Sequence, residues 1–259
     1  MHPYRLSLLQ TGLFWEERDR NLDMFEAMIQ GLDRGVDAVL LPEMFQTGFT
    51  MDAERHAETM DGPTAEWMRK ISSRYGKAIG GSIIISEGDV YYNRFIWAVP
   101  DGTLSTYDKR HLFFLERDSG NYTAGMRRVV VEDKGWRILL AVCYDLRFPV
   151  WLRNREDYEA IFLVANWPAP RRDVWHKLLM ARAIENQCYV AAVNRIGSDG
   201  NGIDYSGDSM VVDPKGNIVV QAEQEAEAIL DATLDFDELM RFKTKFPAWQ
   251  DRDEFDLKL

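Results

Sequence analysis

The segment WRILLAVCYDLRF, residues 136–148, places one cysteine at the end of a run of apolar residues. Residues 136–142 predict a short buried strand, and residues 143–149 predict the sharp turn that leaves it. In open α/β sheets, ligands bind just beyond the carboxyl ends of the strands. Cys143 is therefore a candidate nucleophile, although a free cysteine is often only a small buried hydrophobic residue. The rest of the chain decides between these two interpretations.

The composition is that of a globular protein and excludes two classes of partner. The 259 residues are 46% hydrophobic and 28% charged, which is ordinary for a folded chain, and the formal net charge is −11. An acidic chain lacks the basic surface that nucleic acids and anionic membranes require. Cys143 and Cys188 cannot build a disulfide framework, which indicates a reducing compartment. We find no signal-peptide pattern, and no apolar run approaches the roughly 20 residues of a membrane span, so we expect a cytoplasmic protein.

Strand-like and helix-like segments alternate along the chain. Helices are predicted at 15–32, 65–75, near 151–156 and at 173–187, with a last short helix after 235. Strands are predicted at 4–10, 36–41, 77–87, 90–100, 103–108, 127–132, 136–142, 160–165, 189–194, 205–212, 218–221 and 229–235. Gly88 and Asp89 predict a tight hairpin turn, which makes the sheet mixed rather than wholly parallel. No linker or repeat divides the chain, so we expect one domain over residues 1–259.

Three reactive side chains, Glu43, Lys109 and Cys143, each follow a predicted strand. Singly, each also fits a solvated or a packing role, but strand ends of one sheet would converge on one cleft. A thiol with a pKa of about 8.5 needs a base or a cation to become a good nucleophile at neutral pH. Glu43 would accept its proton if burial raised the pKa of the carboxyl group. Lys109 and the backbone N–H of Tyr144 would hold the oxygen of a tetrahedral intermediate, so the set predicts attack on an amide or nitrile carbon through a thioester.

The other motifs in the sequence give weaker indications of a functional site. His176, on the predicted helix at 173–187, would form a Cys–His dyad with Cys143, but a helix histidine among apolar neighbours fits a structural role. We find neither an HExxH motif nor a metal-ligand spacing of cysteines and histidines, so no metal and no cofactor is predicted. The segment GSDGNG, residues 197–202, precedes a strand rather than a helix, and therefore predicts a flexible loop instead of a phosphate cradle. Cys188 lies among apolar residues and fits a packing role.

Three longer segments resemble the catalytic signatures of a known family, the nitrilase or carbon–nitrogen hydrolase superfamily. They are LLPEMFQTGF (40–49), YDKRHLF (107–113) and VCYDLRFPVWLRN (142–154), in the order that the family has. Within the family, NWPAPR (166–171), RAIENQCYVAAVNRIGSDGNG (182–202) and KFPAWQDRDEF (245–255) are similar to the bacterial omega-amidase branch. The resemblance implies an α/β fold, namely a four-layer α-β-β-α sandwich with mixed sheets.

The resemblance also implies roles for single residues. Glu43 becomes the general base, Lys109 the stabiliser of the transition state and Cys143 the nucleophile. The family often has a second glutamate between the lysine and the cysteine. Counting from Lys109 places this second acid nearer Asp118 than Glu116.

An omega-amidase cleaves the terminal amide of a short 2-oxo dicarboxylic acid monoamide, such as 2-oxoglutaramate or 2-oxosuccinamate, and releases ammonia. The substrate carboxylate needs a second cation, for which Arg147 and Arg171 are the candidates, while Asn166 and Trp167 would form pocket walls. The alternatives are an N-carbamoyl amino acid hydrolase, a deaminated-glutathione amidase, a nitrilase, or a non-catalytic scaffold that keeps the fold.

Family members form homodimers through the helices that follow the cysteine strand and the next strand, so the resemblance implies a homodimer or a higher homo-oligomer. In this chain these segments are 151–155 and 173–187. The tail at 236–259 contains Phe246, Trp249 and Phe255, so we expect it to dock on its own subunit or on the partner.

Overall fold

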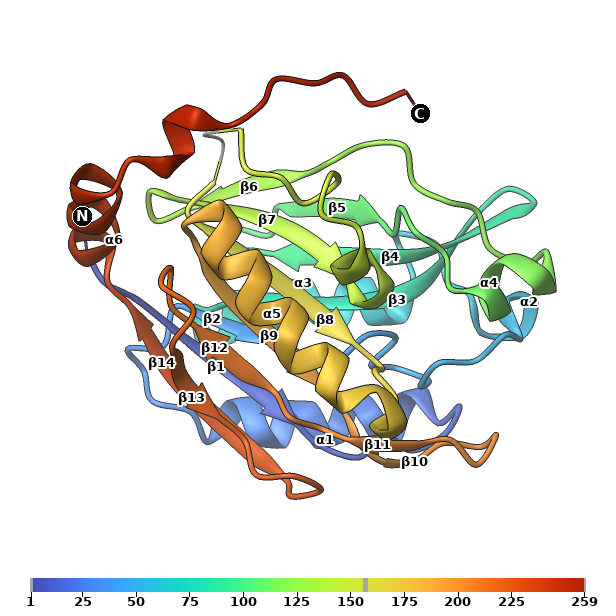
Figure 1. Cartoon of the computed structure of the whole chain (residues 1–259). Helices are drawn as coiled ribbons and strands as arrows, with labels where there is room; N and C mark the ends of the chain where they lie inside the picture. Colours follow the sequence, from blue (N-terminus) through green and yellow to red (C-terminus); the bar gives the residue numbers. More distant parts are fainter. Residues whose placement is uncertain (1, 156–157, 259) are drawn as a thin grey trace.

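The computed structural model describes residues 2–155 and 158–258 and contains two six-stranded sheets packed face to face (Figure 1). Sheet 1 has the strand order β14 (Ala228–Leu234), β1 (Tyr4–Gln10), β2 (Ala38–Leu40), β3 (Ala78–Glu87), β4 (Val90–Ala98) and β5 (Leu104–Asp108). Sheet 2 has the order β13 (Ile218–Gln221), β12 (Met210–Val212), β9 (Tyr189–Asn194), β8 (Ala160–Ala165), β7 (Trp136–Val142) and β6 (Val130–Asp133). A separate hairpin joins β10 (Ile196–Ser198) and β11 (Asp204–Ser206).

Both sheets are mixed, as the hairpin signals predict, and both repeat one pairing pattern. In sheet 1, β1, β2 and β3 are parallel, and all other pairs are antiparallel. In sheet 2, β7, β8 and β9 are parallel, and all other pairs are again antiparallel. The central parallel strands are covered on both faces, which explains why β8 consists of apolar residues that are all buried.

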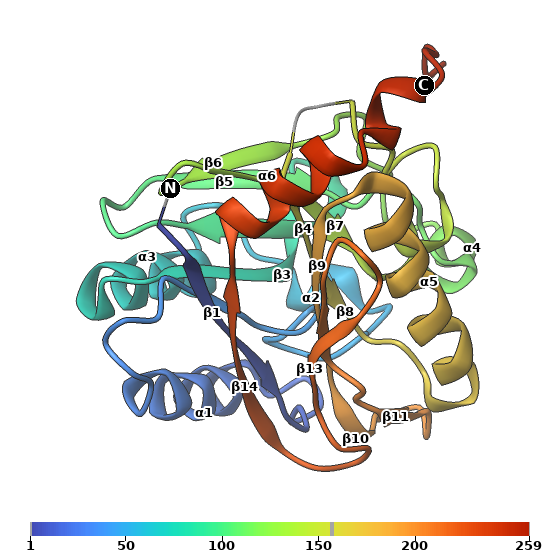
Figure 2. The same cartoon turned by 60° about the vertical axis from the view of Figure 1, so that its left-hand side comes forward.

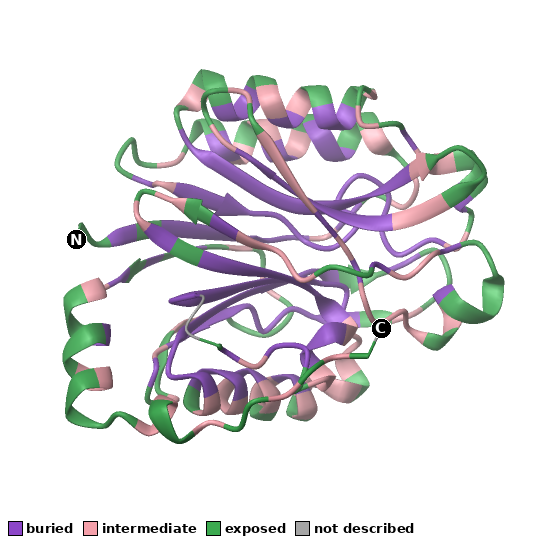
Figure 3. Ribbon diagram, turned by 90° about the horizontal axis from the view of Figure 1, so that it is seen from above, coloured by how far each residue is buried: buried purple, intermediate pink, exposed green. Residues whose placement is uncertain are grey.

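Helices cover the outer face of each sheet and complete the four layers that the family resemblance implies (Figure 3). The helix α3 (Pro63–Tyr75) contacts β3 and β4 of sheet 1 with α1 (Arg18–Gln30) beside it, and α5 (Arg172–Asn186) contacts β9 and β12 of sheet 2. Each helix turns an apolar stripe toward its sheet, because buried residues recur at helical spacing. These residues are Leu22, Phe25 and Ile29 in α1, Ala65, Met68 and Ile71 in α3, and Trp175, Leu179 and Ala183 in α5.

Aromatic side chains join the inner faces of the two sheets. The ring centroid of Phe162 in β8 lies 5.7 Å from that of Trp97 in β4 and 6.1 Å from that of Tyr4 in β1. All three side chains are buried, and burying a large apolar side chain contributes about 1.5–3 kcal/mol. The sheets therefore have a fixed spacing at their centre.

The structure differs from the predicted elements at several places. The predicted strand at 205–212 is two strands, β11 and β12, separated at Gly207 and Asp208, which both have positive φ. The predicted flexible loop at 197–202 belongs to the β10–β11 hairpin. The short helices α2 (Ala53–His56) and α4 (Phe114–Ser119) were not predicted.

The helix predicted near 151–156 is also wrong in its described part, and Glu156 lies outside the described residues. Residues 151–155 form turns and irregular structure, and the helical segment is instead the 3-10 helix η1 (Cys143–Arg147). Side-chain hydrogen bonds hold the chain after it, because the Trp151 Nε1–H donates to the Tyr107 hydroxyl at 3.0 Å and the Asn154 amide donates to the Tyr158 carbonyl at 2.8 Å. These bonds fix an irregular path in place of a helix.

The C-terminal segment packs on its own subunit. The helix α6 (Phe236–Lys245) crosses the end of the sandwich near the N-terminus (Figure 2). Beyond it, the Gln187 side chain donates to the Phe246 carbonyl at 2.8 Å and accepts from the Trp249 backbone N–H at 3.0 Å. Among residues 2–155 and 158–258, no helix combines the length and the apolar character needed to cross a membrane.

Substitution of Gly125, which lies beside β5, tests how tightly the fold holds the segment that contains Lys109. The Gly125 backbone N–H donates to the Lys109 carbonyl at 2.9 Å, and a Cβ at Gly125 would lie 2.0 Å from the Asp108 carbonyl oxygen. Because backbone cannot yield as a flexible side chain does, we expect Gly125→Ala to destabilise the protein by about 1–3 kcal/mol in urea unfolding. Gly31→Ala is the control, since a Cβ there meets only an ordinary contact at 3.5 Å. Equal stability of the two variants would contradict this prediction.

Candidate active site

Glu43, Lys109 and Cys143 converge on one cleft, but they come from two sheets rather than one. Glu43 follows β2 and Lys109 follows β5, both in sheet 1, whereas Cys143 follows β7 in sheet 2. The expectation of a single sheet is therefore wrong, because sheet membership depends on strand pairing and not on the local pattern. The cleft lies where the ends of the two sheets meet.

The Lys109 ammonium group lies between two carboxylates. Its Nζ is 2.8 Å from Glu43 Oε1 and 2.7 Å from Glu116 Oε2, and all three side chains are fully buried. The Asn93 amide donates to both carboxylates, at 2.8 Å to Glu43 and 3.0 Å to Glu116. The Asn166 backbone N–H donates to the other Glu43 oxygen at 2.8 Å. Each of the three buried charged groups is therefore hydrogen-bonded, as buried charges require.

Glu116, and not Asp118, is the second acid beside Lys109. Glu116 lies in the first turn of α4 and also accepts the Phe113 backbone N–H at 2.7 Å, which caps that helix. The Asp118 side chain is 60% exposed and pairs with Arg117. Residues two apart on a helix do not face the same side, so only one of the two acids can reach the site. The count from Lys109 that favoured Asp118 is therefore wrong.

Burial and the neighbouring charges shift the pKa values of Lys109 and Glu116. Burial lowers the pKa of Lys109, but the charges of Glu116 and Glu43 outweigh it and raise that pKa above its ordinary value. Burial raises the pKa of Glu116, and the charge of Lys109 offsets part of this effect. The lysine therefore stays cationic.

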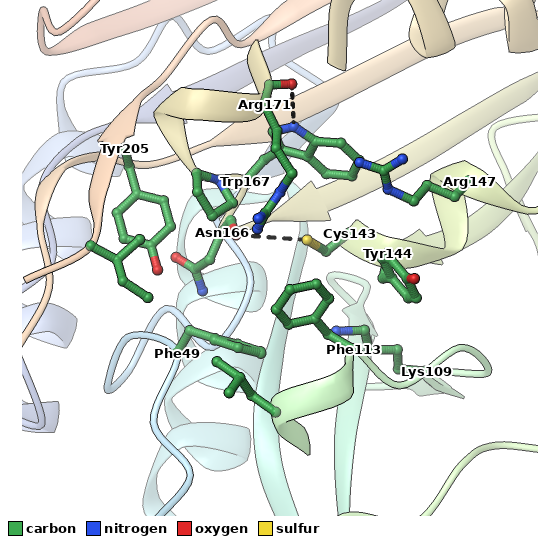
Figure 4. A pocket seen from close by; sticks show the side chains of 13 residues that line it. Phe49, Lys109, Phe113, Cys143, Tyr144, Arg147, Asn166, Trp167, Arg171 and Tyr205 are labelled. Carbon is green, nitrogen blue, oxygen red and sulfur yellow. Dashed lines mark hydrogen bonds between the residues drawn. The ribbon is translucent and has the colours of Figure 1, made fainter. Parts of the chain in front are cut away.

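Cys143 lies at the start of η1 with a positive φ of 43°, which is uncommon for a residue other than glycine (Figure 4). Its side chain is buried, and its Sγ lies 3.8 Å from the Asn166 carbonyl oxygen. Burial raises the pKa of the thiol well above its ordinary value, and the charge of Glu43 raises it further, while Lys109 opposes this. The resting thiol is therefore protonated at neutral pH and needs a base in order to react.

Asp145 links the cysteine turn to the lysine segment, and the sequence reading missed it. Its buried carboxylate accepts the Val142 backbone N–H at 3.0 Å and the Tyr107 hydroxyl at 2.7 Å. It also accepts the His111 backbone N–H at 3.0 Å and lies 2.8 Å from His111 Nδ1. An aspartate in a tight turn commonly bonds nearby backbone, and this was the one available signal.

A small cavity of about 40 Å³ adjoins Cys143 and Lys109. The other predicted binding residues, Tyr144, Arg147, Asn166, Trp167 and Arg171, all line it. The Arg147 guanidinium lies 5.1 Å from the Trp167 ring, and that of Arg171 lies 5.1 Å from the Phe113 ring. Neither arginine pairs with a carboxylate in the part of the chain that the structure describes. Two cations therefore border the cavity and are free to bind an anion.

Asn166 and Trp167 build the far wall of the cavity from the end of β8. The Asn166 side-chain amide donates to the Glu43 carbonyl at 2.7 Å, and the Trp167 Nε1–H donates to the Arg171 carbonyl at 2.9 Å. Asn194, at the end of β9, accepts the Trp167 backbone N–H at 2.8 Å. Each wall residue is thus fixed by hydrogen bonds to a neighbouring segment.

The remaining candidates lie outside this site. His176 Nε2 lies 3.3 Å from Asp208 and 3.3 Å from Gln221, and the residue does not line the cavity, so no Cys–His dyad forms. Cys188 is fully buried in the core, where burial raises the pKa of its thiol. No group of three or more His, Cys, Asp or Glu side chains within the described residues is arranged to hold a metal ion.

The two-sheet α-β-β-α sandwich and the thiol beside a lysine–carboxylate cluster define a cysteine hydrolase with two packed sheets. Residues 5–244 match the carbon–nitrogen hydrolase family, and the chain belongs to this family, the nitrilase superfamily. It is an amidase-type hydrolase that acts on carbon–nitrogen bonds other than peptide bonds. The predicted family and fold are thereby confirmed.

Several relatives resemble the chain over its whole length. Omega-amidase YafV of Escherichia coli (strain K12) is 47% identical over 257 residues, which cover 99% of this chain and 100% of the relative. The 2-oxoglutaramate amidase of Bacillus subtilis (strain 168) is 32% identical over 96% of this chain and 97% of its own. A carbon–nitrogen hydrolase superfamily protein of Xanthomonas campestris, whose structure holds an arsenic adduct in its active site, has a TM-score of 0.97 and 45% identity, covering 100% of both chains.

Neutralising each of the two α4 acids in turn tests which of them orients Lys109. Glu116→Gln removes one of the two charges that orient the lysine, so we expect kcat for ammonia release from an amide substrate to fall by about 10²-fold. Asp118→Asn changes only an exposed side chain and should stay within about twofold of the unchanged enzyme. Circular dichroism of both variants controls for folding. A loss in Asp118→Asn as large as that in Glu116→Gln would overturn the assignment.

Proposed function

We propose that this enzyme is an omega-amidase. It hydrolyses the terminal amide of short 2-oxo dicarboxylic acid monoamides, such as 2-oxoglutaramate and 2-oxosuccinamate, to the 2-oxo dicarboxylate and ammonia. The observation that carries the proposal is a cavity that combines the Cys143 thiol with two arginines that have no carboxylate partner among the described residues. The full-length identity of 47% to an omega-amidase and of 32% to a 2-oxoglutaramate amidase supports it.

The first half of the reaction forms a thioester. Glu43 accepts the Cys143 proton while the sulfur attacks the amide carbon, so the C–S bond forms as the thiol is deprotonated. The carbonyl oxygen becomes an oxyanion, which is stabilised by Lys109 and by the Tyr144 N–H. This N–H lies in the first turn of η1, where backbone N–H groups have no acceptor within the helix. Collapse of the intermediate breaks the C–N bond, and the proton held by Glu43 passes to the leaving nitrogen as ammonia forms.

The second half restores the enzyme. Water takes the place of ammonia, Glu43 accepts its proton, and the oxygen attacks the thioester carbon. The same two donors hold the second oxyanion. Breakage of the C–S bond releases the carboxylic acid, and the proton returns to Cys143. Because Lys109 keeps its charge between Glu43 and Glu116, it stabilises both oxyanions without itself losing a proton.

The substrate carboxylate binds Arg147 or Arg171 in this proposal. Both guanidinium groups border the cavity that contains the thiol, and a guanidinium matches a carboxylate with two parallel hydrogen bonds. The aromatic rings beside them exclude water and strengthen the ionic contact. A neutral amide lacks this contact, which favours 2-oxo acid monoamides over simple amides and nitriles.

We further propose a cytoplasmic location, a homodimeric assembly and a single domain. Both cysteines are free, which supports a cytoplasmic location. We also propose a homodimer through α5 and the segment 151–155; Ile184 of α5 exposes 54% of its surface, and Val150, the residue before that segment, exposes 53%. The core shared by both sheets supports one domain over residues 1–259, with 236–259 as a docking tail.

Ammonia release separates this function from its alternatives. We expect hydrolysis of 2-oxoglutaramate and 2-oxosuccinamate, with far slower release from glutamine, an N-carbamoyl amino acid and a simple nitrile. Cys143→Ala should remove the activity, since no other described thiol lines the cavity. If neither 2-oxo acid amide is hydrolysed, the omega-amidase proposal fails. Full activity of Cys143→Ala would instead exclude the thioester mechanism.

Neutral substitutions identify the cation that binds the carboxylate. A hydrogen bond to a charged group is worth about 1.5–3 kcal/mol, so Arg147→Gln or Arg171→Gln should raise KM for 2-oxoglutaramate by about 10- to 100-fold. Turnover of a neutral amide of the same size should not change. Arg117→Gln serves as the matched control, because this exposed arginine pairs with the exposed Asp118 and does not line the cavity. Unchanged KM in both cavity variants would show that neither arginine binds the substrate.

A further inference from the structure

The β10–β11 hairpin forms one wall of the cavity. Its residues Ile203 and Tyr205 line the space beside Cys143. In Figure 4, Tyr205 lies across the cavity from Tyr144 and Arg147. The hairpin comes from the glycine-rich segment 197–202 and the strands around it, which the proposed mechanism does not use.

One carboxylate, that of Asp199, fixes both wall residues. Asp199 Oδ1 accepts the backbone N–H groups of Asn201 at 2.8 Å and Ile203 at 3.0 Å. Its Oδ2 accepts the Tyr205 hydroxyl at 2.9 Å. Because the phenol donates its proton to Asp199, Tyr205 presents a ring to the cavity rather than a free hydroxyl donor. The wall therefore acts on a substrate through its shape.

The hairpin is anchored at its base and at its tip. At the base, the Ile196 backbone N–H donates to the Thr11 carbonyl at 3.1 Å, and the buried Arg195 donates to the Ile196 and Ser198 carbonyls, both at 3.2 Å. At the tip, a Cβ on Gly200 would lie 2.3 Å from Trp15 Nε1, so the glycine packs directly on that indole. A wall held from both ends keeps its distance from the thiol.

We propose that the β10–β11 hairpin sets the chain length that the active site accepts, and that Asp199 is the positioning residue that holds it. The inference deepens the proposed omega-amidase function, on which it rests. Covalent attack fixes one end of the substrate at Cys143 and an arginine holds its carboxylate end, so a rigid wall on the side of the cavity limits the room for additional methylene groups between them. Pockets of this kind discriminate by about 10- to 200-fold per methylene.

Three variants of the hairpin test the inference. Asp199→Ala frees both wall residues, whereas Asp199→Asn keeps an oxygen for the backbone N–H groups and a polar partner for the phenol. Asp204→Ala is the matched control, because Asp204 is an exposed aspartate of the same hairpin that contacts Ser198 and does not line the cavity. Tyr205→Leu shortens the wall while leaving the Asp199 turn in place, so the test stands even if Asp199→Ala does not fold.

The first measurement is kcat/KM for four-, five- and six-carbon 2-oxo dicarboxylic acid monoamides. We expect Asp199→Ala and Tyr205→Leu to raise the ratio of the six-carbon to the preferred substrate by about 10-fold or more, the effect of one methylene. Asp199→Asn and Asp204→Ala should keep the ratio of the unchanged enzyme. A merely structural role of Asp199 would lower kcat/KM equally for all three lengths and leave the ratio unchanged.

The second measurement does not depend on the natural substrate. Alkylation of Cys143 is followed by mass spectrometry with iodoacetamide and with N-butyl iodoacetamide. Loosening the wall should raise the rate for the longer reagent relative to the shorter one in Asp199→Ala and Tyr205→Leu. If the unchanged enzyme hydrolyses no monoamide, the proposed function fails and the alkylation ratio still decides on the hairpin. If neither ratio moves in these two variants, the inference on the hairpin is overturned.

Discussion

One ammonium group between two buried carboxylates is the interaction on which the rest of the site depends. Taking three charges out of water is costly, and breaking one partner from a buried ion pair costs about 3–5 kcal/mol. Lys109, Glu43 and Glu116 offset this cost because Asn93 and the Asn166 backbone supply further hydrogen bonds. These partners come from β4 of sheet 1 and the end of β8 of sheet 2, so the cluster is complete only when both sheets are packed.

The same cluster governs the reactivity of the thiol. Burial and the charge of Glu43 keep Cys143 protonated, while Lys109 acts in the opposite direction. A protonated thiol is a weak nucleophile, so in the proposed mechanism the proton moves only as the sulfur meets an amide carbon. The positive φ at Cys143 and the four contacts of Asp145 place the sulfur at the cavity in advance. Positioning, rather than a permanently activated sulfur, is then the main contribution of the fold.

Local patterns in the sequence predicted most strands and the three strand-end residues, because alternation and apolar runs record which backbone is buried. They did not predict that Cys143 stands on a second sheet, since strand pairing is a non-local property, and only the family resemblance implied the sandwich. Which of Glu116 and Asp118 faces Lys109 depends on the residue at which the short helix α4 begins. That helix is capped through Phe113, which lacks the usual serine or threonine signal. Asp145 was missed because its partners at 107 and 111 are distant in sequence.

The repeated pairing pattern gives the sandwich an approximate internal correspondence in which β2 matches β8. Glu43 follows the first of these strands and Asn166 follows the second, and the two residues bond each other, from the Asn166 N–H to the Glu43 carboxylate and from the Asn166 amide to the Glu43 carbonyl. The proton acceptor of the proposed reaction is thus bonded across the gap between the sheets. A core substitution that widens this gap, even at Phe162 far from the cavity mouth, would change the path of the proton. The volume of the core side chains in this enzyme therefore affects the rate of the reaction as well as the stability of the fold.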